Sequence, residues 1–309
     1  MPNRISIAAV TSMLGQKKAI NLSLAVAVIL LGAKTFASVI TGSSSIYSDA
    51  AESVVHVFAV LFASWALRFS YKPADEDHHY GHDKISFVSA GFEGAMISAA
   101  AALILYEAGK QFVHGVELDH LGLGIWITAA AAGVNLVLGL SLIRAGKNSR
   151  SPLLLANGKH VLTDVWTSAA VICALVLITL TGWLWWDPIF AVIAALNILR
   201  VGIGLIRGSF SGLLDEADPA LESSAREMLD RLTSERGLSY HNFRHRHSGR
   251  SHWIEFHLIF ANAMTVETAH QLATEIEAAV AKLGAPDCRV ITHLEPQSAE
   301  ARIEHWERP

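Results

Sequence analysis

Charged residues are scarce in this chain, and its two cysteines form no recognisable motif. Only 17% of the 309 residues are charged and 52% are hydrophobic, which excludes a purely soluble protein. The formal net charge of -4 leaves no basic surface of the kind that nucleic-acid binding requires, so no nucleic-acid partner is expected. Cys173 and Cys288 lie far apart and without a CxxC, which excludes a disulfide framework and a thiolate zinc site. Both are expected as small core residues.

The chain also lacks the zinc-hydrolase sequence HExxH. That sequence places two zinc ligands and a general base on one helix, and a metal-dependent hydrolase needs such a base beside an open coordination position. We therefore expect no hydrolase activity of this kind. An intramembrane metal-dependent hydrolase is kept only as an alternative.

Long apolar stretches are what the chain has in abundance. Six of them come close to the roughly 20 residues that a membrane-spanning helix needs. They lie at 19–41, 46–69, 85–112, 121–144, 154–181 and 188–210. The first is too long for a cleaved signal peptide, so we expect it to be retained. The sequence therefore predicts an all-α bundle of six transmembrane helices in residues 1–213.

Basic residues outside these stretches fall on one side of the predicted membrane. They are Lys17, Lys18, Arg68, Lys72, Lys84, Arg144, Lys147, Arg150 and Arg207. The opposite connections hold Lys110 near a helix end and three tryptophans that suit a membrane interface, Trp183, Trp185 and Trp186. Because basic residues accumulate on the cytoplasmic side, both termini are predicted to be cytoplasmic.

Near Leu214 the composition changes, and charged residues return. Asp218 and Pro219 indicate the start of a helix. The apolar periods that follow predict the order helix, strand, strand, helix, strand, with a hairpin around Ser248 and Gly249. Residues 214–309 are therefore predicted to form a small cytoplasmic α+β domain. At roughly 90 residues it is near the lower size for independent folding, which favours pairing with a partner subunit.

Ionisable side chains inside two predicted spans form the first candidate site. On the second span Asp49, Glu52 and His56 follow one another at helical spacing, and on the fifth His160 and Asp164 are four residues apart. Each set therefore projects from one helix face. Ionisable groups at membrane depth are costly and mark ion or proton pathways. Two imidazoles and two carboxylates suit zinc or a similar divalent ion, so the predicted ligands are Glu52, His56, His160 and Asp164.

Two points stay open at this site. Asp49 lies one turn from Glu52 and is either a direct ligand or a residue that supports the ligands or the pathway. The alternative for the whole set is a group of internal hydrogen bonds or ion pairs that stabilises the bundle.

The connection between the second and third spans is the second candidate site. Its sequence, KPADEDHHYGHDK, runs from Lys72 to Lys84 and is crowded with acidic residues and histidines. Asp75, His78 and His82 are close enough along the chain to converge on one metal, and the remaining carboxylates would attract cations. The alternative is a solvated acidic loop.

Histidines of the predicted soluble domain form the third candidate site. His257 and Glu255 are two residues apart on one predicted strand, and His293 and Glu295 repeat that relation on another. Residues two apart on a strand share a face, so such pairs can hold a metal between strands or subunits. The alternative is ordinary surface histidine, which is the expectation for His245, His247 and His252.

Taken together, these residues resemble the cation diffusion facilitator family of divalent-metal transporters, over nearly the whole chain. In that family a GS turn introduces the second helix, whose ligands are four residues apart, and TGSSSIYSDAAESVVH puts Glu52 and His56 at those places. The usual pair there is Asp with Asp or His with Asp, so this pair is a departure. His160 and Asp164 match the family's pair on the fifth helix. The loop PADEDHHYGHDK is similar to its second site, with ligands at Asp75, His78 and His82.

The resemblance also implies a role for the soluble domain. In the family, this domain pairs across a homodimer around a two-metal site. The residues of this chain that match its ligands are His241, His257, His270, His293 and Glu295, the last standing where Asp is common.

What the resemblance implies as a whole is a secondary active transporter of the bacterial inner membrane, and not an enzyme. It would export a divalent cation in exchange for protons by alternating access, as do the family's zinc and iron exporters. Zinc is favoured as the transported cation over iron, manganese, cobalt and cadmium because the predicted ligands include two imidazoles. The implied partners are the lipid bilayer, divalent cations, protons and a second copy of the chain, joined through the cytoplasmic domain and the membrane helices. A membrane-anchored metal sensor is the remaining alternative.

Overall fold

The protein divides into two compact units. The computed structural model describes residues 7–41, 44–114, 123–284 and 288–298. The first unit, called the helical unit, is Met1–Ser211, and the second, called the sheet unit, is Gly212–Pro309.

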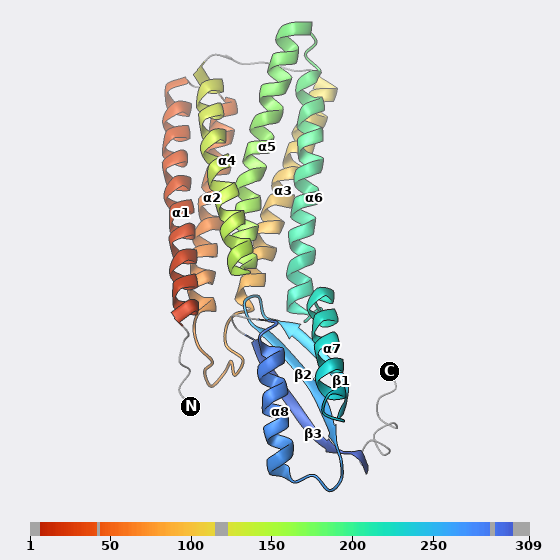
Figure 1. Ribbon diagram of the computed structural model, residues 1–309. Helices are drawn as coiled ribbons and strands as arrows, with labels where there is room; N and C mark the ends of the chain where they lie inside the picture. The colour runs from red at the N-terminus through yellow and green to blue at the C-terminus, as the bar shows by residue number, and fades with distance from the viewer. Residues whose placement is uncertain (1–6, 42–43, 115–122, 285–287, 299–309) are drawn as a thin grey trace. The chain divides into compact units, whose positions relative to one another are not determined.

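Long helices make up the helical unit (Figure 1). They are α1 (Ile7–Thr41), α2 (Ser44–Ser70), α3 (Ile85–His114), α4 (Leu123–Ser149), α5 (Pro152–Thr181) and α6 (Trp186–Leu213). Within the described ranges, five are long and apolar enough to cross a membrane, and α2 contributes the shorter apolar stretch His56–Ser70. The predicted class, a bundle of membrane helices followed by a small α+β domain, is confirmed.

Helix ends differ from the predicted ones where charged residues extend a helix. The helix α1 begins at Ile7 rather than near residue 19, and α4 continues to Ser149 rather than ending near 144. Lysine is a good helix former, so Lys17, Lys18 and Lys147 continue these helices beyond the apolar run. The start of α5 follows the expected chemistry: Pro152 occupies the first turn, and the Ser151 hydroxyl accepts a hydrogen bond from the Leu154 N–H at 3.4 Å.

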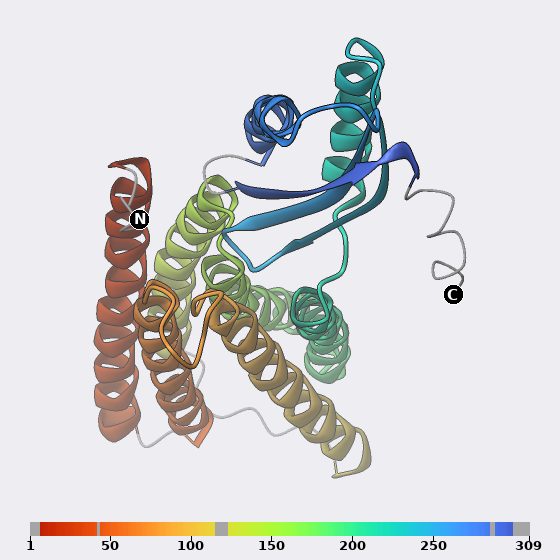
Figure 2. The same cartoon turned by 90° about the horizontal axis from the view of Figure 1, so that it is seen from below.

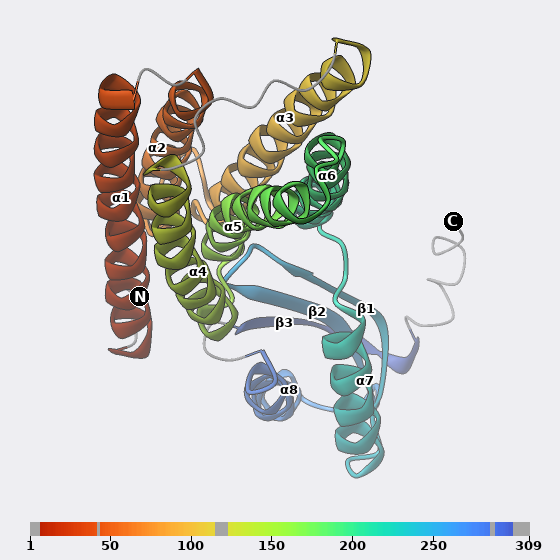
Figure 3. The ribbon, with the colours of Figure 1, turned by 90° about the horizontal axis from the view of Figure 1, so that it is seen from above.

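The helix α5 belongs to two apolar cores. On one side, buried leucines and valines join it to α1, α2 and α4, and on the other Ala156 packs with Ala90 and Ile97 of α3 and Ile198 of α6. Seen from above, α5 lies between the group of α1, α2 and α4 and the pair α3 and α6 (Figure 3). Residues carried by α5 can therefore meet partners from both groups of helices.

The sheet unit has the predicted order of elements. These are α7 (Pro219–Ser234), β1 (Ser239–His247), β2 (His252–Phe260), α8 (Val266–Ala281) and β3 (Cys288–Pro296). The strand order is β1-β2-β3, with β1 antiparallel and β3 parallel to the central β2. Both helices cover the same face of the sheet (Figure 2), because alternate residues of β2, such as Ile254, Phe256 and Leu258, pack with apolar residues of α7 and α8. The other face is open within this unit.

Three expectations about single residues are wrong. His245 and His252, expected at the surface, are buried near the ends of β1 and β2. The Asp218 N–H, at the start of α7, donates a hydrogen bond to His245 Nε2 at 2.8 Å, which accounts for the burial of that ring. Cys173, expected in the core, is exposed on α5, as apolar side chains on the outside of a membrane bundle can be.

Candidate metal centre

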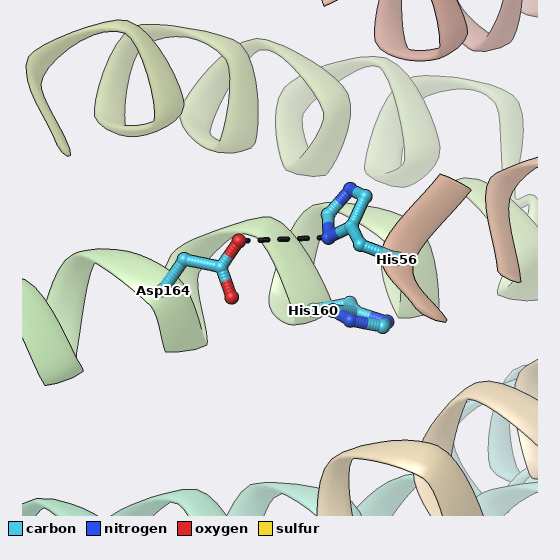
Figure 4. A group of neighbouring side chains, drawn as sticks. All are labelled: His56, His160 and Asp164. Carbon is cyan, nitrogen blue, oxygen red and sulfur yellow. Dashed lines mark ion pairs between the residues drawn. The ribbon is translucent and has the colours of Figure 1, made fainter. Parts of the chain in front are cut away.

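The helices α2 and α5 bring together three of the residues predicted for the membrane site. One nitrogen or oxygen atom from each of His56, His160 and Asp164 lies within 4.8 Å of the others. His56 Nδ1 is 3.5 Å from Asp164 Oδ2, and the His56 and His160 rings meet edge to face with centroids 4.6 Å apart (Figure 4). The helical spacing of His160 and Asp164 places both on the side of α5 that faces α2.

Both imidazoles of this cluster have a ring nitrogen that makes no hydrogen bond to a described residue. The Nδ1 atoms of His56 and His160 are buried, and neither has a hydrogen-bond partner among the described residues. Buried polar atoms are nearly always satisfied, so two unsatisfied ring nitrogens beside a carboxylate call for a ligand. A divalent cation fits, because neutral imidazole and carboxylate are ordinary zinc ligands.

A small polar pocket surrounds this cluster. Its lining residues are Lys34, Ser53, His56, Ala131, Ala132, Asn135, His160, Asp164, Thr167 and Ser168. The Asn135 amide on α4 donates a hydrogen bond to Asp164 Oδ2 at 3.4 Å and so holds that carboxylate in place. Sequence reasoning missed both Asn135 and Lys34, although a polar residue inside an apolar span is a signal that marks each of them.

The other two predicted residues of this site cannot be placed. Both Asp49 and Glu52 belong to α2, but their side chains lie outside the described part of the structure. The helix backbone puts Glu52 one turn before His56. Glu52 as fourth ligand and the role of Asp49 therefore stay predictions.

The loop between α2 and α3 brings together Asp75, His78 and His82, the three residues predicted for the second site. One carboxylate oxygen of Asp75 is 3.2 Å from His78 Nδ1, and the other is 3.3 Å from His82 Nε2. His82 is buried and held by an edge-on contact with Phe69, whereas the other two residues are exposed. The Asp75 carboxylate thus bridges two histidines on the surface of a tight loop.

The charge state of Asp75 favours cation binding. Desolvation raises the pKa of this carboxyl, but the hydrogen bonds from the His78 backbone and ring together lower it by more. The pKa of Asp75 therefore lies below its usual value. The carboxylate is therefore ionised across the physiological range, as a metal ligand must be.

The third cluster lies on the open face of the sheet. His241, His257 and Glu295 each contribute an atom to a group within 4.8 Å. The buried Glu295 carboxylate is at the centre: its oxygens are 3.0 Å from His241 Nε2, 2.8 Å from His257 Nδ1 and 3.6 Å from His293 Nε2. His257 Nδ1 has no hydrogen bond of good geometry among the described residues despite the short distance. The donor set fits a divalent cation held by these residues.

Strand register explains this convergence. His241 pairs with His257 across β1 and β2, and His257 pairs with His293 across β2 and β3, so three imidazoles form a row across the sheet. His293 is mostly exposed. His270 is exposed on α8 and is not among the converging atoms.

A bulge in β1 adds a residue that the sequence did not point to. The register shifts between His241 and Arg244, and Asn242 has a positive φ of 50°, a conformation that asparagine tolerates better than most residues. The bulge directs the Asn242 amide to within 3.2 Å of His257 Nε2. Asn242 therefore helps to orient the His257 ring.

Comparisons with known proteins match both parts of the chain to one family. Residues 20–214 match the cation efflux transmembrane domain, and residues 218–297 match the cation efflux protein cytoplasmic domain. An uncharacterized transporter of Synechocystis sp. is 38% identical over 275 residues, which cover 89% of this chain and 88% of that protein. The cation-efflux pump FieF of Shewanella oneidensis is 30% identical over 286 residues, covering 92% and 95%, and that of Yersinia enterocolitica is 32% identical over 283 residues, covering 90% and 93%.

Members of the cation efflux family are transporters, so the expectation that the chain is not an enzyme is confirmed, and the hydrolase alternative is set aside. The apolar helices and these relatives make it a multi-pass membrane protein. On the strength of a family match across most of its length, the chain belongs to the cation diffusion facilitator family.

Proposed function

We propose that this protein exports a divalent metal cation, zinc foremost, from the cytoplasm in exchange for protons. The observation that carries the proposal is the convergence of His56, His160 and Asp164 from two membrane helices, with two buried ring nitrogens that no described residue satisfies. Zinc is favoured over iron, manganese, cobalt and cadmium because two imidazoles and a carboxylate, with Glu52 as fourth ligand, form a tetrahedral set that zinc prefers. The name of the FieF relatives, cation-efflux pump, supports the direction of transport.

Proton exchange follows from the chemistry of the ligands. Metal and protons compete for the same lone pairs, because a ligand must be deprotonated to coordinate, and histidine titrates close to physiological pH. The bundle alternates between a state open to the cytoplasm, where the site takes the metal, and a state open to the far side, where protons displace it. The Asp75 loop would collect cations beside this pathway.

The domain roles follow from the placement of the sites. Residues 1–213 would form the transport domain, and residues 214–309 a cytoplasmic domain that binds metal and pairs with a second copy of the chain. The open face of the sheet suits that pairing, since it carries the Glu295 cluster together with the exposed apolar Ile291. Metal bound at that interface would shift the balance between the two states of the bundle through its different affinity for each.

Two further parts of the proposal are the membrane in which the protein resides and the side on which its termini lie. The FieF relatives are proteins of bacteria, and the basic residues flanking the helices favour cytoplasmic termini. We therefore assign the protein to the bacterial inner membrane with cytoplasmic termini.

Flux measurements on the purified full-length chain test this function. Proteoliposomes are loaded with a zinc-sensitive dye, and zinc, iron, manganese, cobalt and cadmium are offered one at a time with and without a pH gradient. We expect zinc flux that a pH gradient accelerates and that Asp164→Asn abolishes. Zinc binding without flux of any cation would favour the sensor, and zinc flux indifferent to the pH gradient would remove the antiport.

A further inference from the structure

A carboxyl group that belongs to none of the three metal clusters is buried inside the helical unit. The side chain of Glu93, on α3, is 0% exposed. Ala90 and Ile97, which precede and follow it on the same face of α3, pack with Ala156 of α5 and Ile198 of α6. Glu93 therefore projects into an apolar core and not into the pocket around His56.

This carboxyl group has a single polar neighbour among the described residues. The Asn157 amide of α5 donates a hydrogen bond to Glu93 Oε1 at 3.4 Å, and its own carbonyl accepts one from the Ser23 hydroxyl of α1 at 2.8 Å. Glu93 Oε2 is buried and has no hydrogen-bond partner. An unsatisfied oxygen in an apolar core needs an explanation beyond packing.

No charged side chain of the described part of the chain compensates this carboxyl. Close to this part of α3 lie Phe62 of α2, which meets the adjacent Phe92, Asn157 of α5 and apolar side chains of α6. Ser23 of α1 is linked to Glu93 only through its hydrogen bond to Asn157. Among the side chains that the structure describes, no lysine, arginine, histidine or second carboxylate forms a hydrogen bond or ion pair with Glu93. An ionised carboxylate with one amide partner is strongly disfavoured in such surroundings, whereas the neutral acid is tolerated. The group that the buried oxygen can accept is therefore a proton.

The same helix that contacts Glu93 also carries two of the predicted metal ligands. Asn157 precedes His160 by three residues on α5, a rise of about 4.5 Å along the axis. Any tilt or rotation of α5 that opens the metal pocket must also move the Asn157 amide away from Glu93 or towards it. The carboxyl would then meet water when the bundle opens to either side, and the apolar core in between.

From this geometry we propose that Glu93 is a proton-binding site of the transport cycle, separate from the metal ligands. The inference rests on the proposed function and deepens it by naming a second carrier of the counter-transported protons. In the state in which Glu93 meets water on the cytoplasmic side, its O–H bond breaks, the electron pair stays on the carboxylate and the proton passes to water. On the other side the carboxylate takes a proton from water before it returns to the core.

The test compares Glu93→Gln with Glu107→Gln in the full-length chain. Glu107 lies on the same helix, but it is exposed and paired with Lys110 at 3.0 Å, so it serves as the matched control. Zinc flux and proton flux are recorded together in proteoliposomes with a zinc dye and a pH dye. We expect Glu93→Gln to bind zinc with unchanged affinity but to move about one proton fewer per zinc ion. Glu107→Gln should match the parent in both zinc affinity and proton ratio. An unchanged ratio in Glu93→Gln would overturn the proposal.

An infrared measurement separates this inference from the antiport itself. The parent protein should show the carbonyl stretch of a protonated carboxylic acid that changes on zinc binding, and Glu93→Gln should lack it. If the parent moves zinc without protons, the antiport fails, and the carrier role of Glu93 fails with it. If the parent exchanges zinc for protons but lacks this band, the antiport stands and the role of Glu93 is overturned. Should Glu93→Gln not fold, Asn157→Ala must shift the band, because it removes the only described amide partner.

Discussion

His56 Nδ1 and Asp164 Oδ2 face each other across the contact between α2 and α5 at a distance of 3.5 Å. Two ligand atoms of a tetrahedral zinc ion, each at about 2.0 to 2.1 Å from the metal, are roughly 3.3 Å apart. The observed separation is therefore close to that of two atoms sharing one ion. His160 lies beside them with its donor atom within 4.8 Å of both, so the set needs only small side-chain rotations to close around a cation.

Removing the second imidazole of this set tests whether the three residues act together. We expect His160→Ala to reduce zinc flux into proteoliposomes by more than about tenfold, since losing a direct ligand costs at least as much as losing a residue that only supports one. The measurement is the initial rate of zinc uptake at several zinc concentrations.

Lys159 provides the control for that substitution. It is the neighbour of His160 on α5, and its side chain is exposed outside the pocket. Lys159→Ala should keep the parent rate. Equal rates for His160→Ala and Lys159→Ala would mean that His160 does not bind the transported ion.

In the α2–α3 loop, Asp75 is the residue whose loss should matter most. Its two carboxylate oxygens face one histidine each, so Asp75→Asn removes the negative charge that both rings share. We expect zinc affinity at this loop to fall by about 10- to 100-fold, measured by calorimetric titration of the detergent-solubilised protein. His79→Ala alters an exposed histidine outside the cluster and should leave the titration unchanged; the same loss in both variants would point to the loop's general charge instead.

The cluster on the sheet offers a matched pair of glutamates. Glu295 touches three histidines and is buried, whereas Glu255 is exposed on β2 and outside the cluster. Glu295→Gln should weaken metal binding to the sheet unit by about 10- to 100-fold, and Glu255→Gln should not. The readout is cobalt(II) absorption, which reports nitrogen and oxygen ligands directly. A normal cobalt spectrum in Glu295→Gln would exclude Glu295 as a ligand.

Spacing along the chain was enough to predict part of these sites. His160 and Asp164 are four residues apart on one helix, and Asp75, His78 and His82 are close in a short loop, so local geometry alone brings each set together. The sheet cluster depended on strand register, and only the resemblance to a family indicated that His241 and Glu295 would meet.

Other features depend on tertiary packing, and the sequence could not show them. The bulge at Asn242 is set by the pairing of β1 with β2, and the burial of His245 by its hydrogen bond to the start of α7. Glu93 is different, because a lone carboxylate inside an apolar span is visible in the sequence and is a functional signal by itself. The strongly apolar span around Glu93 makes this signal easy to miss.

The hydrogen bond to His245 predicts that the sheet unit loses stability in acid. Burial lowers the pKa of His245 by more than the nearby carboxylates of Glu222 and Asp218 raise it, and burial also lowers the pKa of His247. Below the usual value of about 6.5 the unfolded chain therefore binds more protons than the folded one, so the free energy of unfolding falls as the pH falls. Protonation of His245 Nε2 also removes the acceptor for the Asp218 N–H.

Amide exchange in α7 and β1 of the full-length protein measures this effect at about pH 7.5 and about pH 5.5, after correction for the intrinsic pH dependence of exchange. Protection should be lost at the lower pH in the parent and lost less in His245→Gln. His270→Gln, at an exposed position on α8, should lose as much protection at the lower pH as the parent does. Equal losses in all three proteins would show that His245 is not responsible.

Close packing of α3 against α6 makes a final prediction about Gly94. A Cβ atom at this position would lie 2.9 Å from the Gly202 carbonyl oxygen and 2.9 Å from Leu205 Cβ, so Gly94→Ala must push the two helices apart. Overpacking of this kind costs about 1 to 3 kcal/mol, and we expect a lower midpoint of thermal unfolding in detergent. Gly109→Ala makes the same change on the same helix where nothing lies within 4 Å, and it should leave the midpoint unchanged or raise it, because alanine is favoured over glycine inside a helix. A midpoint for Gly94→Ala equal to that of Gly109→Ala would mean that α3 and α6 are not packed this closely in the membrane.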